Sequence, residues 1–385
     1  MKKRIAAILI AALLLLCSCR NNGADTQKTE DDFQNDSQLS VDFIDVGQGD
    51  SILIRSDGQS MLIDAGTNES GKTVLNFLKD KGIEKLDYAV GTHPHADHIG
   101  GLDDVIKDID VGDLLMPNAV TDTKTFNDVL DAAESKGLSI TVPEENEEFS
   151  VGQSKVTVLS KNGEQSDNLN NSSIVLKVTC GEFSLLLTGD AEKEVEKQLL
   201  SDKKDVSADV LKVGHHGSGT STSAEFLKAV SPKCAVISCG KDNDYGHPHQ
   251  ETLEKLEKQG TEIYRTDLLG TINLEANSDG KFSLSAKGKS EQTFDGNDDG
   301  VLSQSGDGQN GGIQSYSSAA QSELSDALEG ESVGEQYVLN IGTKKFHKTD
   351  CQSAKSISEK NRKDYTGSRQ QLIDEGYSPC GVCKP

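Results

Sequence analysis

Four candidate metal ligands lie within six residues of one another in this chain, in the order His-x-His-x-Asp-His: His93, His95, Asp97 and His98. The chain has eight histidines, and three of them are in this short stretch, which disfavours a loop of incidental surface histidines. At the end of a strand, alternate side chains point the same way, so the first two histidines can converge on one cation. If the chain then turns, the aspartate and the last histidine can face a second cation. Imidazole and carboxylate bind zinc, manganese or iron, so the stretch predicts a metal centre.

Two later apolar segments lead to further candidate ligands. A strand predicted over 183–188 is followed by Asp190, whose carboxylate can bridge two cations there; the alternative is the N-cap of the next helix. A strand predicted over 210–213 leads to His215 and His216, and adjacent residues on a strand point to opposite sides. We therefore expect one of the two to complete the second metal's ligands and the other to face the substrate. His215 is the expected ligand because it directly follows a glycine.

Several motifs occur along the chain in the order in which one protein family has them. They occupy residues 43–51, 62–66, 93–101, 187–190, 211–218 and 245–249. The set resembles the metallo-β-lactamase fold and, within it, the soluble hydrolase domain of ComEC, the bacterial DNA-uptake channel. The resemblance implies an α/β fold, an αββα sandwich over 40–285. It also implies a hydrolase site with two divalent metal ions, Zn or Mn.

The resemblance assigns roles to residues beside the ligands. Asp64, after a predicted strand, would support the metal loop. The wider fold has a third histidine for the first metal just before the strand at 174–178, where this chain has Asn170 and Asn171. An asparagine carbonyl or a water would take that place; either asparagine fits, and we assign the supporting role to Asn171. His247, in Tyr-Gly-His-Pro-His, is expected to act on the substrate, with a rigid turn as the alternative.

Hydrophobic spacing predicts the remaining elements. Strands are expected over 41–54 (two strands), 61–63, 88–90, 174–178, 235–238 and 271–274, and helices over 71–81, 100–109, 126–136, 191–200 and 251–259. Cys234 and Cys239 flank one strand, which would hold them roughly 16 Å apart, whereas a disulfide needs Cα atoms within about 7 Å. We expect both of them, and Cys180, to be small buried residues.

The first 19 residues have the pattern of a cleaved signal peptide. A basic start precedes twelve apolar residues, too few to span a bilayer, which needs about twenty. A leucine three residues before Cys19 resembles a bacterial lipoprotein motif and predicts lipidation there; Cys17, or a secretory signal without lipid, is the alternative. Residues 20–39 have the composition of a tether. We therefore expect export, with attachment by the lipid anchor only to the extracytoplasmic face of the cell membrane.

The C-terminal segment 337–385 predicts a separate zinc module. It offers His-x₃-Cys and Cys-x₂-Cys as ligands for one structural zinc: His347, Cys351, Cys380 and Cys383. About fifty residues are too few for a stable core without such a metal. The segment resembles the N-terminal zinc domain of Ada, a DNA-repair methyltransferase, but His347 stands where that domain has its reactive cysteine. Methyl transfer is therefore not expected, and 286–336 has the composition of a disordered acidic linker.

Charge limits the partners of this chain. The net charge is −24, but residues 337–385 carry nine Lys and Arg against five Asp and Glu, or +4, which leaves −28 for the rest. Binding to nucleic acid without sequence preference depends on Lys and Arg, so only the C-terminal module has a balance that favours DNA.

These features predict a surface-tethered, dinuclear metal-dependent hydrolase with Asp97, His216 and His247 as catalytic residues. The resemblance implies a phosphodiester substrate, with DNA as the first choice and a competence-related nuclease as the activity. One alternative is a phosphodiesterase for cell-wall or lipid headgroups such as phosphocholine esters. Another is a non-catalytic surface DNA-binding protein. The missing third histidine disfavours β-lactam hydrolysis, and the sequence does not indicate a protein partner.

Overall fold

The computed structural model describes residues 37–162, 166–286, 289–294, 301–304, 335–349, 351–355, 357–367, 372, 377–380 and 383. The predicted signal peptide, the lipidation site Cys19 with its alternative Cys17, and nearly all of the tether lie outside the described residues. Among the residues that are described, no helix has the length and apolar character needed to cross a membrane. The chain divides into two compact units, one ending at Asp307 and the other beginning at Gly308, and each is described by itself.

The first unit contains two mixed sheets. In spatial order, the first sheet consists of β17 (Val301–Gln304), β16 (Lys289–Phe294), β15 (Phe282–Ala286), β14 (Ile272–Ala276), β1 (Leu39–Phe43), β2 (Ile52–Ser56), β3 (Gln59–Ile63), β4 (Lys85–Val90), β5 (Asp110–Leu115) and β6 (Ile140–Thr141). The second consists of β13 (Glu262–Arg265), β12 (Cys234–Ile237), β11 (Val210–Lys212), β10 (Phe183–Leu187), β9 (Leu176–Cys180), β8 (Ser154–Val158) and β7 (Glu148–Val151). Strands β3 to β6 are parallel, and so are β10 to β13. The carboxyl ends of parallel strands meet at one edge, where binding sites of open α/β sheets commonly form.

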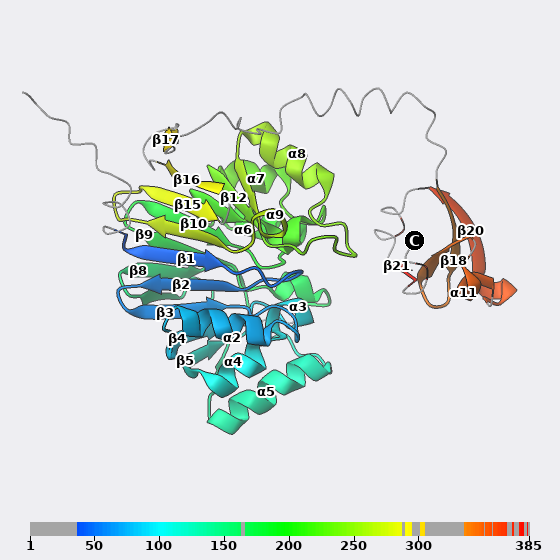
Figure 1. The fold of residues 1–385 in the computed structure, drawn as a ribbon, viewed down its shortest axis with the longest axis horizontal. Helices are drawn as coiled ribbons and strands as arrows, with labels where there is room; N and C mark the ends of the chain where they lie inside the picture. The colour runs from blue at the N-terminus through cyan, green and yellow to red at the C-terminus, as the bar shows by residue number, and fades with distance from the viewer. Residues whose placement is uncertain are drawn as a thin grey trace, which may run out of the picture. The chain divides into compact units, whose positions relative to one another are not determined.

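Helices cover the outer face of each sheet (Figure 1). The helices are α2 (Gly71–Asp80), α3 (Ala96–Ile99), α4 (Leu102–Asp108), α5 (Lys124–Lys136), α6 (Lys193–Ser201), α7 (Ala224–Val230), α8 (Gln250–Gln259) and α9 (Thr266–Leu269), with short 3₁₀ turns η1 (Leu169–Ser172) and η2 (Gly214–Gly217). One apolar cluster joins α2, α4 and α5 to the first sheet, and another joins α6, α7 and α8 to the second. A third cluster fills the space between the sheets. The predicted αββα sandwich is therefore confirmed.

The helix predicted over 100–109 is α4, and a glycine pair separates it from the short helix α3 before it. A Cβ atom on Gly100 would lie only 2.3 Å from the Ala96 carbonyl oxygen and 2.3 Å from the Asn68 nitrogen. Only glycine allows so close a backbone approach. The glycine pair therefore lets the turn after β4 lie against the neighbouring loop, where it carries the metal-ligand motif.

The first unit extends beyond both of its predicted boundaries. Leu39, assigned to the tether, begins β1 and is 1% exposed. Strands β16 and β17 lie within 286–336, the segment predicted to be a disordered linker. One physical reason is the buried Phe294 ring, which stacks on Phe282 with centroids 4.9 Å apart. Hydrogen bonds from Ser283 to Glu291 and from Tyr264 to Gln292 also hold β16. The composition of the segment is that of a linker and therefore did not predict these contacts.

The second unit contains a small four-stranded sheet. Its order is β20 (Arg362–Gly367), β18 (Glu335–Asn340), β19 (Lys345–Lys348) and β21 (Ser378–Pro379), with α11 (Gln352–Lys355) and the 3₁₀ turn η3 (Glu359–Asn361). Alternation along β18 sends Tyr337 and Leu339 into one apolar cluster and Val338 into another. The second cluster includes Cys351 and Cys380, so the predicted zinc ligands form part of the core.

Replacing Phe183 by alanine should destabilise the first unit by about 3–5 kcal/mol, the usual cost of removing a buried aromatic ring. Phe183 in β10 and Phe282 in β15 are fully buried, and their ring centroids lie 5.3 Å apart between the two sheets. Urea unfolding followed by circular dichroism measures the change. Leu268→Ala, at a position 57% exposed, is the control and should change stability by less than about 0.5 kcal/mol. Equal stabilities for the two variants would contradict the described packing.

Candidate metal centre

Asp64 fixes the turn that carries the histidine motif. Its carboxylate accepts hydrogen bonds from the Thr92 N–H at 2.8 Å and from the Thr92 hydroxyl at 2.7 Å. Its Oδ2 also lies 2.8 Å from His98 Nδ1. This contact holds the Nδ1–H of His98 on the carboxylate and leaves its Nε2 facing the site, a common arrangement for metal-binding histidines. Asp64 thus lies where the resemblance expects a supporting carboxylate.

His93 and His95 come together in the loop after β4 rather than on the strand itself, which ends at Val90. Their Nε2 and Nδ1 atoms are 3.0 Å apart. The His93 side chain is fully buried, and its Nδ1 lies 3.3 Å from the Ser173 hydroxyl. The two histidines therefore form one pair of converging donors.

A second group of donors comes from both sheets, and its four ligand atoms lie within 4.8 Å of one another: Asp97, His98, Asp190 and His216. Asp97 and His98 follow β4, whereas Asp190 follows β10. His98 Nε2 is 3.2 Å from Asp190 Oδ1, and His216 Nε2 is 3.2 Å from Asp97 Oδ2 and 3.6 Å from Asp190 Oδ2. Asp190 Oδ2 also lies 3.9 Å from His93 Nε2. Asp190 therefore lies between the two donor groups.

The donor set fits divalent cations. His98 Nε2, His216 Nε2 and Asp190 Oδ1 are buried, face one another and have no hydrogen-bond partner among the described residues. Leaving such a group without a partner costs about 1–3 kcal/mol, so native proteins rarely do it without an ion or another ligand. The alternative role for Asp190 is wrong, because Glu192 occupies the N-cap position of α6.

The geometry favours His216, rather than the predicted His215, as the ligand of the second group. The two lie in η2 rather than on a strand, and both have positive φ, 51° and 54°. The His216 ring is 1% exposed, and its Nδ1 lies 2.9 Å from the Ser238 carbonyl oxygen, so its Nε2 faces the donor group. His215 lies at the rim, where its Nδ1 is 3.1 Å from the Thr220 hydroxyl and its Nε2 is 3.6 Å from Asp190 Oδ2. The position after a glycine therefore does not decide which histidine faces the donor group, and the ligand assignment stays a prediction.

Of the two asparagines, Asn170 has the side-chain carbonyl without a hydrogen-bond partner among the described residues. Asn171 accepts a hydrogen bond from the Glu192 N–H at 3.0 Å and donates to Glu194, so its amide holds the start of α6. Asn170 Oδ1 is buried without a hydrogen-bond partner in the described structure, while its amide donates to Glu192 Oε1. The geometry thus favours Asn170 for the place of the missing histidine, and Asn171 supports from further away.

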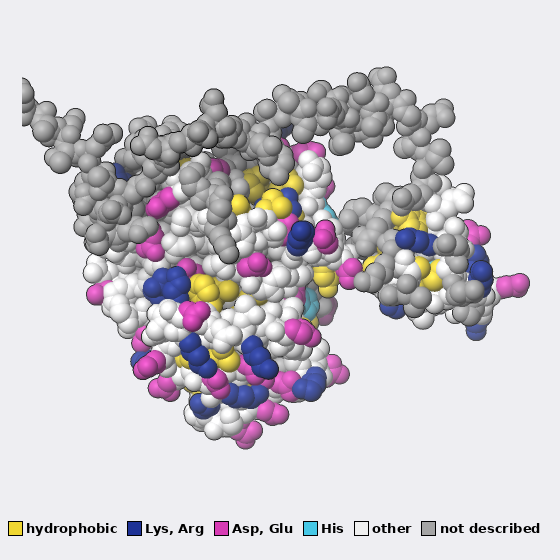
Figure 2. Space-filling model, viewed as in Figure 1, with side chains coloured by type: hydrophobic (Ala, Val, Ile, Leu, Met, Phe, Trp, Pro, Cys, Tyr) yellow, Lys and Arg dark blue, Asp and Glu magenta, His cyan; other side chains and the backbone are white. Residues whose placement is uncertain are grey.

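His247 joins the site from the loop after β12. Its ring centroid is 5.4 Å from that of His215 and 6.1 Å from that of His216. Tyr245, 54% exposed, stacks on His247 at 5.6 Å. By contrast, His249 accepts a hydrogen bond from the Gly219 N–H and belongs to the turn. Figure 2 shows histidine side chains at the edge of this unit, so the site opens to solvent there.

Asp50 and Lys212 were missed by the sequence analysis. The Lys212 ammonium lies 2.8 Å from Asp50 Oδ2, and both side chains are at most 2% exposed. Asp50 Oδ1 is in turn 3.4 Å from His216 Nδ1. A lysine within an otherwise apolar strand was the available signal, because a buried ammonium requires an anionic partner.

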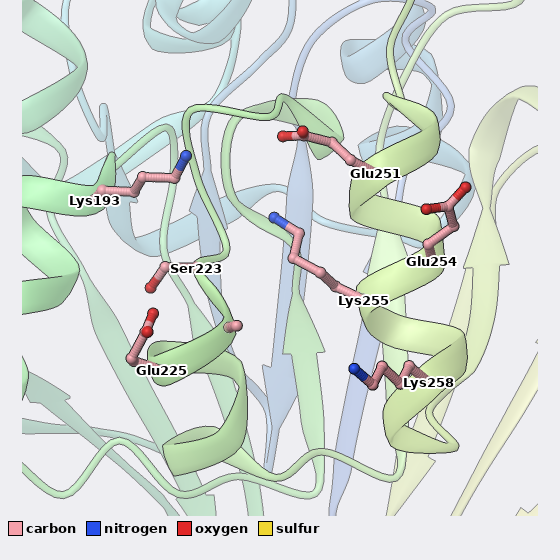
Figure 3. Close-up of a pocket in the computed structure, with 8 residues that line it drawn as sticks. Lys193, Ser223, Glu225, Glu251, Glu254, Lys255 and Lys258 are labelled. Carbon is pink, nitrogen blue, oxygen red and sulfur yellow. The ribbon is translucent and has the colours of Figure 1, made fainter.

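A cavity of about 490 Å³ lies away from this site, between α7 and α8. Figure 3 shows its lining of opposed lysines and glutamates, among them Lys193, Lys255 and Glu251. None of its lining residues is a candidate ligand, and we assign no function to it.

Metal uptake at neutral pH should release protons. Burial opposes charge on His98 and His216, but Asp190 and the other neighbouring carboxylates outweigh it. They raise the pKa of His98 well above its usual value and that of His216 to about 10. Between pH 6.5 and 10 a cation must displace these protons, so its affinity should rise with pH. Calorimetry of Mn²⁺ binding in buffers of different ionisation enthalpy counts the protons. His216→Asn should release about one proton fewer than wild type on binding Mn²⁺. The control His249→Gln should release the same number of protons as wild type. An unchanged number for His216→Asn would contradict the prediction.

The second unit brings its four predicted zinc ligands together, with ligand atoms within 4.8 Å of one another: His347, Cys351, Cys380 and Cys383. Cys351 Sγ lies 3.6 Å from His347 Nδ1. The Lys348 N–H donates to Cys383 Sγ at 3.4 Å, a contact that stabilises a thiolate. The arrangement fits one tetrahedral zinc.

Cys383→Ser should lower the zinc content by about one ion per chain and unfold the second unit, because a module of this size depends on its metal. Elemental analysis and limited proteolysis measure the two effects. Cys239→Ala, in the first unit, should leave both unchanged. Retention of zinc by a protease-resistant Cys383→Ser protein would contradict the assignment.

The sequence model of the Metallo-beta-lactamase superfamily matches residues 44–241, about half of the chain, including every candidate ligand from His93 to His216. The chain therefore belongs to the metallo-β-lactamase superfamily, whose hydrolase fold binds divalent metals.

Its relatives include proteins named for competence and recombination. The chain is 37% identical over 267 residues to ComE operon protein 3 of Bacillus subtilis, an alignment covering 64% of this chain and 34% of that protein. It is 30% identical over 246 residues to Competence protein ComA of Neisseria gonorrhoeae, covering 62% and 32%. It thus spans about a third of these relatives, and the resemblance predicted from the motifs is confirmed. Among solved structures, CmlA, a diiron β-hydroxylase from Streptomyces venezuelae, matches with 16% identity and a TM-score of 0.44 over 62% of this chain and 54% of CmlA.

Proposed function

We propose that the first unit is a dinuclear metal-dependent phosphodiesterase that acts on DNA. One observation carries this proposal: donors from both sheets meet in two adjacent groups, and the Asp190 carboxylate lies between them. Two adjacent cations are the usual device for in-line displacement at phosphorus, because they stabilise both the attacking and the leaving oxygen. Divalent cations in this site would also activate water.

The residues at the open side of the site would handle the substrate. His215 takes over the role first given to His216, because it lies at the rim with its Nε2 towards Asp190. Burial and the neighbouring His216 and His215 lower the pKa of His247 to about 3. His247 is therefore neutral at pH 7 and suited to hydrogen bonding rather than to charge neutralisation. Asp97 would bind the second cation and help to orient the attacking water.

DNA is the proposed substrate because the relatives are named for competence and recombination. The net charge of the chain, −24, opposes a polyanionic substrate, and the C-terminal segment, with its charge of +4, offsets this only locally. The acidic balance instead favours a small phosphodiester such as a phosphocholine ester, which is the second candidate. Export and lipid attachment at Cys19 are also proposals, supported by the sequence pattern alone.

A substrate panel tests the proposal. Full-length protein with Mn²⁺ should cleave bis(p-nitrophenyl) phosphate and single-stranded or plasmid DNA. Asp97→Ala should lower both rates by at least about 10²-fold, because a ligand of the second group is lost. Asp108→Ala is the matched control, since this acid is exposed and pairs only with Lys79 among the described residues.

Each other outcome has its own meaning. Turnover of phosphocholine esters without DNA cleavage would replace the nuclease assignment by the headgroup one. Retention of DNA without turnover of any ester would support a binding protein instead. Equal rates for Asp97→Ala and Asp108→Ala would contradict catalysis at this centre.

A further inference from the structure

A buried ion pair touches the second donor group. Asp50 and Lys212 form it at 2.8 Å, and the Lys212 ammonium also donates to the Val213 carbonyl at 3.1 Å. Removing two opposite charges from water costs about as much free energy as their attraction returns, so a buried pair is a weak source of stability. A pair placed in contact with a metal site therefore suggests a role in the site.

The pair joins the two sheets. Asp50 precedes β2 of the ten-stranded sheet, and Lys212 is the last residue of β11 in the seven-stranded sheet. The second donor group is divided in the same way, since two of its members follow β4 of the first sheet and two follow β10 and β11 of the second. The distance between its halves thus depends on how the sheets are held together at this edge.

Asp50 contacts both halves of the donor group. Its N–H donates to the Asp97 carbonyl oxygen at 3.1 Å. The preceding Gly49 has φ of +143°, and a Cβ there would lie 2.3 Å from the same oxygen, so glycine is required for this approach. On the other side, Asp50 Oδ1 lies 3.4 Å from His216 Nδ1, whose hydrogen-bond acceptor is the Ser238 carbonyl.

We propose that Asp50 and Lys212 are positioning residues that hold Asp97 and His216 at the separation required to bind a cation. This inference rests on the proposed dinuclear site. Asp64 orients His98, which belongs to the same sheet, whereas Asp50 acts across the two sheets through Lys212. Without the ion pair, the separation between the two halves of the donor group would no longer be fixed. The binding of one of the two cations would then be weaker.

Electrostatics agree with this assignment. The Asp50 carboxylate lies between the Lys212 ammonium, 2.8 Å from its Oδ2, and the His216 ring, whose Nδ1 is 3.4 Å from its Oδ1. The ammonium compensates the buried negative charge. An anion beside Nδ1 strengthens the Nε2 of a metal-binding imidazole as a donor.

Mn²⁺ binding to the full-length protein tests the inference. The C-terminal site is first loaded with one equivalent of zinc, which its thiolates bind in preference to the imidazole and carboxylate site; Mn²⁺ binds thiolates poorly. Electron paramagnetic resonance then measures free Mn²⁺ and the exchange-coupled signal of a Mn²⁺ pair. Wild type should bind two Mn²⁺ and give the coupled signal. The double variants Asp50→Asn/Lys212→Met and Asp50→Asn/Lys212→Gln, which bury no unpaired charge, should bind the weaker ion about 10–100-fold less tightly and lose coupling.

Lys177→Met/Asp205→Asn is the matched control. This Lys–Asp pair, 2.7 Å apart, also includes a largely buried lysine, but it makes no hydrogen bond or ion pair with a candidate metal ligand in the described structure. It should keep wild-type affinity and coupling. Wild-type binding by either folded double variant at positions 50 and 212 would overturn the inference alone. If neither of these folds while the control does, the pair is a requirement of the fold and the inference is equally wrong. A wild-type chain that binds no Mn²⁺ would overturn the proposed function as well.

Discussion

The contacts of the Asp190 carboxylate with three histidines are the constraint on which the arrangement of the first unit depends. One of its oxygens faces His98 at 3.2 Å, and the other faces His216 at 3.6 Å and His93 at 3.9 Å. His93 and His98 follow β4 and His216 follows β11, so the contact forms only if both sheets present their carboxyl edges to the same place. Parallel pairing of β3 to β6 and of β10 to β13 produces that arrangement. The αββα sandwich therefore brings histidines from both sheets to one shared carboxylate.

Unusual backbone conformations then aim the donors. Asp64, His215 and His216 all have positive φ, as does Gly189 just before Asp190. A non-glycine residue in this region is disfavoured and persists only where its surroundings compensate for it. At each of these places a strand ends and the chain must turn at once while its side chain stays at the sheet edge. Backbone strain of this kind therefore occurs at the donors, as is common at functional sites, and also at several turns elsewhere in the described chain.

The local part of the site was predictable from sequence, and the part that depends on tertiary geometry was not. His93, His95, Asp97 and His98 are close in sequence, so their spacing alone brought them together. The choice between His215 and His216 assumed a strand, whereas both residues have positive φ and lie in a turn. Asn170 and Asn171 both contact Glu192 and differ in which carbonyl lacks a partner among the described residues. Strands β16 and β17 depend on contacts with distant segments of the first unit. None of these is visible in the order of the residues.

The charges of the site favour an anionic substrate once cations are bound. Asp64 and Asp190 are buried there, Asp97 is partly buried, and the Asp50 charge is balanced by Lys212. With neutral imidazoles these groups and the adjacent Glu192 carry a net charge of −4, which two divalent cations would neutralise. Within a strongly acidic chain the cations would attract a phosphodiester at short range, where low dielectric strengthens the interaction, while long-range repulsion is screened by salt. The acidic composition therefore limits how fast a long polyanion approaches more than it limits whether one phosphate binds.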